Sequence, residues 1–259
     1  MGKEEVTKQK FPSEIVDLPS KGLLYPKENP LSSGQVEMKY MTAKEEDILT
    51  SQNLIQKGVV IDKLLQSLVL SDINYNDLYI GDKNAIMIAA RVLGYGKDYD
   101  VTLTCPHCSE KTDVTIDLLN LTENDIDMSL FKNSNEFLFT LPFSKRVLTF
   151  KLLTHADEKK IDEELRFAKK ISNSESKTEL TTRFKYMIIA IDGETDQKII
   201  RDFVDNDFLS KDSLEFRKYI KRISPDVDMS YLFTCDNCGK DNSIQVPMTV
   251  QFFWPNAGL

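Results

Sequence analysis

The sequence is poor in cysteine, histidine and tryptophan, and it contains no long apolar run. Its 259 residues include four cysteines, two histidines and one tryptophan. Four cysteines are too few for the disulfide scaffold of a small secreted protein. The densest apolar stretch, RFKYMIIAI, falls far short of the roughly 18 residues that suggest a membrane span. The N-terminal MGKEEVTKQK lacks the apolar region of a signal peptide. We therefore expect a chain without a membrane span, made in a reducing cytosol.

The motifs of common enzyme active sites are also missing. The sequence has no glycine-rich nucleotide loop of the GxGxxG or GxxxxGK[ST] type, no HExxH and no GxSxG. Acidic residues in KEEDIL and HADEKKIDEEL are typical of a solvated helix face. A hydrolase that uses clustered carboxylates stays open at this point. The pattern favours a protein that is not an enzyme and has no small-molecule substrate.

The charge balance disfavours one class of partner. The chain has 33 lysines and arginines against 41 acidic residues, a formal net charge of −8. Sequence-blind binding of nucleic acid depends on basic side chains that face phosphates, so we do not expect it here. The length suffices for one large domain or two small ones, and the mixture of helical and strand-like patterns predicts an α+β fold.

All four cysteines lie in two CxxC pairs, Cys105/Cys108 and Cys235/Cys238. Alternating strand-like residues flank each pair, in VTLTCPHCSEKTDVTIDL and YLFTCDNCGKDNSIQVPM. Each stretch therefore predicts a β-hairpin whose tight turn carries the thiolates. Two such hairpins face to face would form one tetrahedral four-cysteine site of the zinc-ribbon type. We predict that these four cysteines together bind one structural zinc ion (Zn²⁺).

Sharing one ion satisfies the ligand count better than two separate sites. The only histidines are His107, inside the first CxxC, and His155, which has no counterpart in the other half of the sequence. Three alternatives stay open: an iron site of the rubredoxin type, a redox CxxC of the thioredoxin type, and thiols that bind no metal or form disulfides. The redox motif would have to open a helix, whereas TDVTIDL and NSIQVPM are strand-like.

The similarity of the two cysteine stretches extends outward and predicts an internal duplication. The hairpins and the preceding helices align at an offset of 130 residues, and the strands upstream align at an offset of 112. The extra residues of the second copy are placed in its polar segment 168–182. Each copy begins with a strand that ends at a threonine N-cap, with an acidic residue three positions later. The aligned blocks, in order, are 36–49 with 148–161, 76–93 with 206–223, and the two CxxC stretches.

This organisation divides the chain into five segments. The first segment contains four prolines, which favour an extended course over its own domain or a neighbour. The stretch EFLFTLPFSKRVLTFKLL, where the linker meets the second repeat, has the alternative interpretation of two paired strands. The segments are an extended N-terminal arm (1–35), repeat 1 with the first hairpin (36–120), a linker (121–147), repeat 2 with the second hairpin (148–248), and an aromatic C-terminal tail (249–259).

Most of the chain resembles a known family, and the clearest motifs lie in its first part. Pro19-Ser20-Lys21-Gly22-Leu23-Leu24-Tyr25, then Ser33-Gly34, then MTAKEEDIL from Met41 to Leu49 are similar to the baseplate hub proteins of T4-like contractile-tailed phages, in their longer, cyanophage-like form. The resemblance implies a structural protein of the virion, or a factor that assembles the tail baseplate hub, made in the bacterial host cytoplasm. It implies other baseplate and hub proteins as partners, and no catalytic residues.

The resemblance also suggests which residues bind neighbouring subunits. We predict that the arm, including Tyr25, and the tail residues Phe252, Phe253 and Trp254 bind those partners, since aromatic side chains concentrate binding energy at interfaces. Packing of the tail into the core is the alternative.

The competing interpretation of the whole chain is a cytosolic zinc-ribbon adaptor that contacts nucleic acid or a protein partner. A nucleic-acid adaptor would need basic residues near the hairpins. The sequence offers only Lys97, Lys111 and Lys240 there, beside several aspartates.

Overall fold

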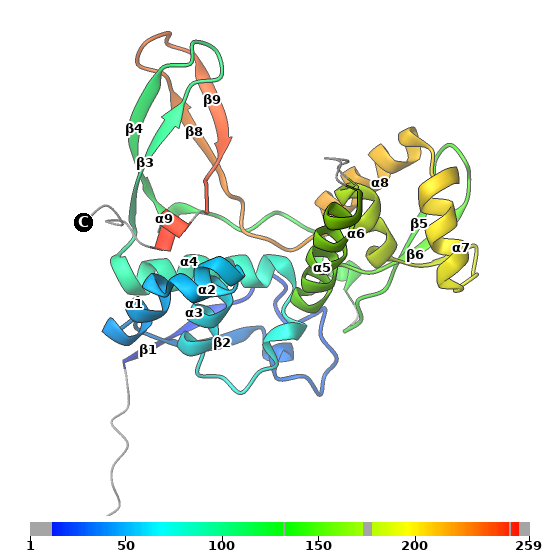
Figure 1. Cartoon of the computed structure of the whole chain (residues 1–259), viewed down its shortest axis with the longest axis horizontal. Coiled ribbons are helices and arrows are strands. Elements are labelled where there is room, and N and C mark those ends of the chain that lie inside the picture. The colour runs from blue at the N-terminus through cyan, green and yellow to red at the C-terminus, as the bar shows by residue number, and fades with distance from the viewer. Residues whose placement is uncertain (1–11, 132, 173–177, 249, 254–259) are drawn as a thin grey trace, which may run out of the picture.

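The computed structural model describes residues 12–131, 133–172, 178–248 and 250–253. They form two α+β lobes side by side, with a pair of β-hairpins standing over the first lobe (Figure 1). We call residues 12–96 the first lobe, residues 137–223 the second lobe, and residues 98–117 with 230–245 the hairpin pair. The mixed α+β class predicted from the sequence is confirmed. In the described part of the chain, every helix is too short or too polar to cross a bilayer.

The first lobe packs helices against a two-stranded antiparallel sheet. In the sheet, Ser13 pairs with Lys39 and Asp17 with Gln35. Four apolar residues of α3 (Val60–Leu68) are buried in the lobe, namely Val60, Leu64, Leu65 and Leu68. The longest helix of the lobe is capped by Gly96, whose positive φ of 84° suits glycine. The elements are β1 (Ser13–Asp17), β2 (Gln35–Lys39), α1 (Ala43–Thr50), α2 (Gln52–Lys57), α3 (Val60–Leu68) and α4 (Ile80–Tyr95).

The described part of the predicted N-terminal arm belongs to the first lobe. It supplies β1 and a short 3-10 turn at Pro30–Ser33. Leu18, Leu24 and Leu31 are fully buried in the lobe's core. The arm therefore covers its own lobe, as the proline spacing allowed, while residues 1–11 lie outside the described residues.

The second lobe is built around a three-stranded sheet in the order β5-β6-β7. The alternative interpretation of EFLFTLPFSKRVLTFKLL as two paired strands is confirmed, since Phe137 pairs with Phe150 and Thr140 with Val147. Rings of Phe150, Phe184 and Phe216 meet behind the sheet at centroid distances of 4.9–5.6 Å. The elements are β5 (Phe137–Thr140), β6 (Val147–Phe150), α5 (His155–Ser172), α6 (Glu179–Met187), β7 (Ile188–Ile191), α7 (Gln197–Asp202) and α8 (Ser210–Ile223).

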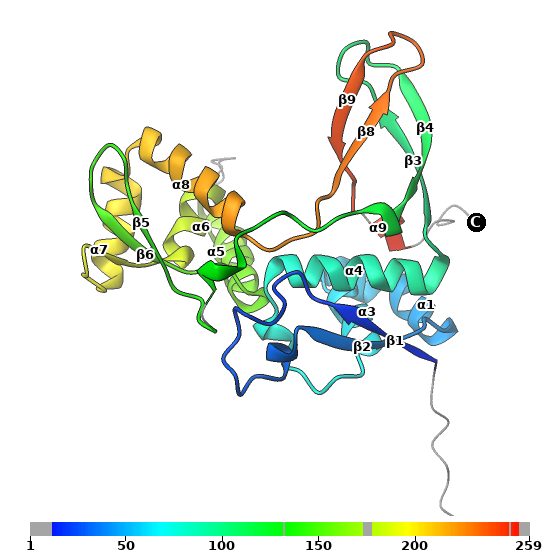
Figure 2. The same ribbon diagram turned by 180° about the vertical axis from the view of Figure 1, so that it is seen from behind.

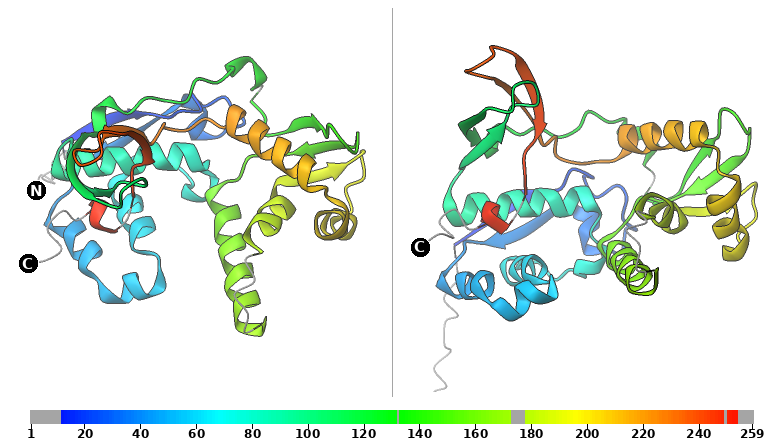
Figure 3. Two further views of the ribbon diagram at one scale, coloured as in Figure 1. Left: turned by 90° about the horizontal axis from the view of Figure 1, so that it is seen from above. Right: turned by 45° about the horizontal axis from the view of Figure 1, so that its top comes forward.

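The hairpin pair contains β3 (Asp98–Thr104) with β4 (Lys111–Asp117), and β8 (Ser230–Thr234) with β9 (Asp241–Gln245). The first hairpin leaves directly from the end of α4. The second is reached from α8 through an extended segment, so the second lobe lies to one side (Figure 2). After β9 the chain turns back, and α9 (Val250–Phe253) lies against α4 under the hairpins (Figure 3).

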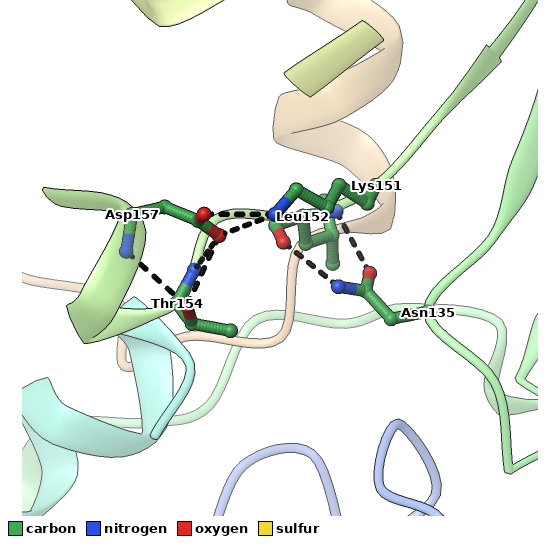
Figure 4. A network of polar contacts seen from close by, with 5 residues as sticks. All are labelled: Asn135, Lys151, Leu152, Thr154 and Asp157. Carbon is green, nitrogen blue, oxygen red and sulfur yellow. Dashed lines mark hydrogen bonds and ion pairs between the residues drawn. The ribbon is translucent and has the colours of Figure 1, made fainter. Parts of the chain in front are cut away.

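The same polar network opens the first α-helix of each lobe. In the first lobe, Thr42 donates to the Glu45 carboxylate from its N–H at 3.0 Å and its hydroxyl at 2.6 Å, and Lys39 lies 2.8 Å from the same group. In the second, Lys151 and Thr154 contact Asp157 at 2.7–3.1 Å (Figure 4). The two predicted N-caps and their acidic partners are thereby confirmed. The offset is 112 residues throughout.

In each lobe, a second set of corresponding hydrogen bonds connects the sheet to a later helix. Asp82, in the first turn of α4, accepts from the Ser20 N–H and hydroxyl and from the Tyr25 hydroxyl at 2.6–2.9 Å. Asp212, in the first turn of α8, accepts from the N–H groups of Phe143 and Ser144 at 2.8 and 2.9 Å. Both carboxylates are buried at 0 % exposure. Each one satisfies polar groups of the loop between two paired strands, which fixes the sheet on the helix.

The lobes touch along α4, the start of α5 and the segment that follows α8. Pro225 approaches Gly81 so closely that a Cβ there would lie 1.8 Å from the Pro225 carbonyl oxygen. Asn84 donates to Asp226 at 3.0 Å. His155 lies between the lobes, 3.2 Å from both Asp62 and Lys83. The contact between the lobes is therefore closest at Gly81, and polar side chains surround that point.

Glu45 provides a test of these buried carboxylates. Burial raises its pKa, but hydrogen bonds from Lys39 and Thr42 outweigh burial and bring the pKa down to about 2. Its stabilising contribution is thus complete above about pH 4.5 and is lost as the pH falls toward 2. We expect Glu45→Gln to lower the free energy of unfolding by about 1–3 kcal/mol at pH 7, measured by urea denaturation, with the difference shrinking toward pH 2.

Asp47→Asn, an exposed position in the same helix, is the control and should change stability little at any pH. A difference between the Glu45 variant and the wild-type chain that stays constant from pH 7 to pH 2 would contradict the assignment.

Candidate metal centre

Each CxxC sits in the tight turn of its hairpin, and the two turns share one backbone geometry. Cys105 N–H donates to the Glu110 carbonyl at 2.8 Å, and Ser109 N–H donates to the Cys105 carbonyl at 2.9 Å. In the second hairpin the matching bonds from Cys235 to Lys240 and from Gly239 to Cys235 measure 3.0 and 2.8 Å. Ser109 and Gly239 have positive φ values of 60° and 64°, which close the turn so that both sulfurs of a pair point the same way.

The two turns bring all four sulfur atoms together. The Sγ atoms lie within 4.8 Å of one another. Cys105 is 3.8 Å from Cys238, and Cys108 is 3.7 Å from Cys235. A tetrahedron of sulfurs around an ion with Zn–S bonds of about 2.3 Å has edges of about 3.8 Å. None of the four is joined in a disulfide. The spacing therefore fits a single tetrahedral ion shared by the two hairpins.

The electrostatics of the four thiols favour a cation among them. Burial raises the pKa of the Cys105 thiol, but the N–H groups of His107 and Cys108 and the neighbouring thiols outweigh burial and bring it to about 6. At Cys238 the Lys240 N–H lowers the pKa, yet burial and the three other thiols outweigh it and raise the pKa to about 11. Each further deprotonation of the four thiols is thus less favourable than the one before, because the negative charges of the thiolates would lie close together. A divalent cation offsets those charges and replaces the protons.

Apolar and polar neighbours hold the sulfurs in place. Leu103 and Phe233 are buried between the hairpins beside Cys105 and Cys235. Asn242, 5 % exposed, donates to the Lys240 carbonyl at 2.8 Å and lies 3.8 Å from the Cys105 sulfur. The amide fixes the second turn against the first cysteine. Nothing in the sequence pattern singled out Asn242, because its role depends on contact between the hairpins.

The surroundings of the cysteines argue against a redox site of the thioredoxin type. Each CxxC leads into a strand, β4 or β9, so neither thiol pair has the helix N-terminus that activates a thioredoxin-type motif. In the described residues the cluster that could hold a metal contains only the four cysteines. A set of four thiolates leaves no open coordination position for water, which favours a structural role. Zinc and iron suit this donor set alike.

The residues predicted to bind partners lie elsewhere and are mostly buried in their own chain. Tyr25 is 1 % exposed and donates to Asp82, while Phe252 and Phe253 pack under the hairpin pair. The Phe252 ring lies 5.0 Å from that of Tyr99. Trp254 lies outside the described residues. A partner would reach the three buried rings only if they left these positions, so their part in partner binding stays a prediction.

Some carboxylates of the acidic α5 face do line a surface hollow: Glu158, Asp162 and Glu163 lie around it with Asp62, together with cations that include Lys83, Lys159 and Arg166. Glu158 pairs with Arg183 at 2.5 Å, and Glu164 pairs with Arg201 at 3.0 Å. These two acids thus connect α5 to α6 and to α7 through ion pairs. The hollow is therefore mixed in charge, and two of the acids on α5 are already paired with arginines.

The model of the family described as T4 bacteriophage base plate protein matches residues 17–254, which is most of the chain and includes both lobes and both CxxC pairs. No curated protein and no solved structure matches the sequence.

The shared site makes a prediction that two separate sites would not. We expect the purified wild-type protein to contain one metal ion per chain by elemental analysis. Cys105→Ser and Cys235→Ser should each reduce this content to near zero, because either change removes one ligand from the same tetrahedron. Ser109→Ala, which keeps all four sulfurs, is the control. Two metal ions per wild-type chain, or half of the wild-type metal content in each cysteine variant, would contradict a shared ion.

Proposed function

This chain belongs to the T4 bacteriophage base plate protein family, and on that premise we propose that it is a zinc-stapled structural or assembly protein of the tail baseplate hub. Family membership makes it a protein of the phage tail, associated with other tail proteins, and suggests a non-enzymatic role. The assignment to the hub rests on the motif from Pro19 to Leu49. The observation that carries the staple is the convergence of the four cysteines within 4.8 Å.

We infer that the chain arose by internal duplication. Matched contacts support this: the Lys39–Thr42–Glu45 network corresponds to Lys151–Thr154–Asp157, and the buried Asp82 corresponds to Asp212. The repeats would then begin one strand earlier than the sequence pattern indicated, at β1 and β5, which pair with β2 and β6. The second copy also carries β7 and α7, after α6, for which the described first lobe has no equivalent.

The proposed ion would join the ends of the two copies. Each copy closes with one hairpin, and neither hairpin has a large core of its own: the interior of the pair consists mainly of Leu103, Phe233 and the two buried cysteines. Two-stranded hairpins are marginal alone in water. The free energy of binding a structural metal becomes free energy of folding. Zinc would therefore hold the hairpin pair together and set the position of the second lobe relative to the first.

A rigid connection of this kind suits a part that joins larger subunits. The lobes would act as a block with fixed surfaces, while the metal carries no chemistry beyond holding four sulfurs. The competing adaptor function is less well supported, because the outer face of β3–β4 carries Asp98, Asp100 and Asp113, which would repel a phosphate backbone.

The proposal is tested in the phage or prophage that encodes the chain. We expect deletion of the gene to leave heads but no complete contractile tails, seen by electron microscopy of lysates. Wild-type protein supplied in trans should restore tails. Cys105→Ser should restore them poorly, most clearly at raised temperature, because the loss of a structural zinc site destabilises the fold.

Ser109→Ala serves as the matched control in the same turn and should complement as well as the wild type. Complete, infectious tails in the absence of the gene would contradict a baseplate function. Full complementation by the cysteine variant would contradict the zinc staple alone. Mass spectrometry of purified virions then separates a resident subunit from an assembly factor.

A further inference from the structure

An apolar hollow of about 350 Å³ opens on the surface where α6, α8 and the start of α4 meet. Leu153, Leu180, Met187 and Ile220 line it. Leu180 is substantially exposed, so apolar surface faces water at this place. The hollow lies beside the contact of Gly81 with Pro225 and thus at the junction of the two lobes. Such a patch, lined by aliphatic side chains, is typical of a site that accepts an apolar side chain of a partner.

Two cations stand at the rim of the hollow outside any ion pair of the described residues. Arg217 and Lys221 lie one turn apart on α8 and are exposed. They contrast with Arg183 across the hollow, which is held by Glu158. The hollow therefore fits an apolar side chain with carboxylates beside it.

The hairpin pair of this same protein presents that combination. Leu232 projects from β8 with 75 % of its surface exposed, the largest exposure among the large apolar residues of the described chain. Asp241 shares its outward face on β9, and Asp236 lies in the adjoining turn; neither forms an ion pair among the described residues. Residues 98–117 and 230–245 contain seven acidic residues and two lysines, so the whole hairpin pair is strongly acidic.

Within one chain these two features do not meet. Leu232 is absent from the residues that line the hollow, and the hairpin pair stands apart from α6 and α8 (Figure 2). We propose that the hairpin pair of one copy docks on the second lobe of another, with Leu232 in the hollow and Asp236 and Asp241 facing Arg217 and Lys221.

This contact joins two different surfaces, each present once on every copy. Such a heterologous contact leaves one free surface at each end of a dimer, so it continues until a ring closes or a filament forms. A single leucine and a few ion pairs make a small interface. The association is therefore weak in solution, in the micromolar to millimolar range, and becomes weaker as salt rises.

The test is sedimentation of the full-length, metal-containing protein from micromolar to near-millimolar concentration. We expect the wild type to self-associate reversibly. Leu232→Glu and the double variant Arg217→Glu/Lys221→Glu should each weaken association about tenfold or more, since like charges facing each other are strongly unfavourable. Leu138→Glu, on β5 and similarly exposed at 68 % but outside the hollow, is the control and should associate like the wild type.

Charge reversal on both surfaces is the decisive experiment. Arg217→Glu/Lys221→Glu and Asp236→Lys/Asp241→Lys should each be monomeric alone and should associate with each other, in a 1:1 ratio, when mixed. Metal content, measured on every variant, shows that the hairpin pair is intact. A wild type that is monomeric throughout, association that survives both sets of changes, or loss of association only on the α8 side each overturns the proposal. Occupation of the hollow by a different baseplate protein, with no self-association, overturns it as well.

Discussion

Four sulfur atoms from hairpins that are more than a hundred residues apart in the sequence must lie within 4.8 Å of one another, and the arrangement of the molecule depends on this constraint. The hairpins have little apolar interior, and packed thiols resist shared deprotonation, as the opposite pKa shifts of Cys105 and Cys238 indicate. A divalent cation would resolve both difficulties, because it would replace the protons and bind the hairpins together. The second lobe reaches the hairpin pair through the extended segment after α8, so holding β8–β9 against β3–β4 also limits where that lobe can lie.

Below the hairpins, buried carboxylates connect separate parts of each lobe, as the proposed metal ion would connect the two hairpins. Asp82 and Asp212 each collect hydrogen bonds from a loop of one sheet and anchor it to a helix that follows much later in the chain. Removing such a group would leave buried donors unsatisfied, which costs more than the bond itself contributes. Both lobes use the same devices at corresponding positions, whereas their outer parts differ, since β7 and α7 extend only the second. That pattern is expected of two copies whose internal constraints were kept while their surfaces diverged.

The sequence predicted well those features that depend on neighbouring residues. The CxxC turns, their flanking strands and the threonine caps at Thr42 and Thr154 are local, and the structure has them where the patterns indicated. It predicted less well what depends on distant partners. The Tyr25 hydroxyl donates to Asp82, and no local pattern indicates that contact. The pairing of β1 with β2, the role of Asn242 and the burial of Phe252 and Phe253 under the hairpins likewise follow from tertiary packing alone.

The central claim is that the two halves of the chain share one ion bound by four thiolates. X-ray absorption at the zinc edge of the full-length protein tests it most directly. The account predicts a single shell of four sulfur atoms at about 2.3 Å from the metal, with no nitrogen or oxygen ligand. A mixed shell that includes histidine nitrogen or water oxygen, or a shell of only two sulfurs, would contradict it.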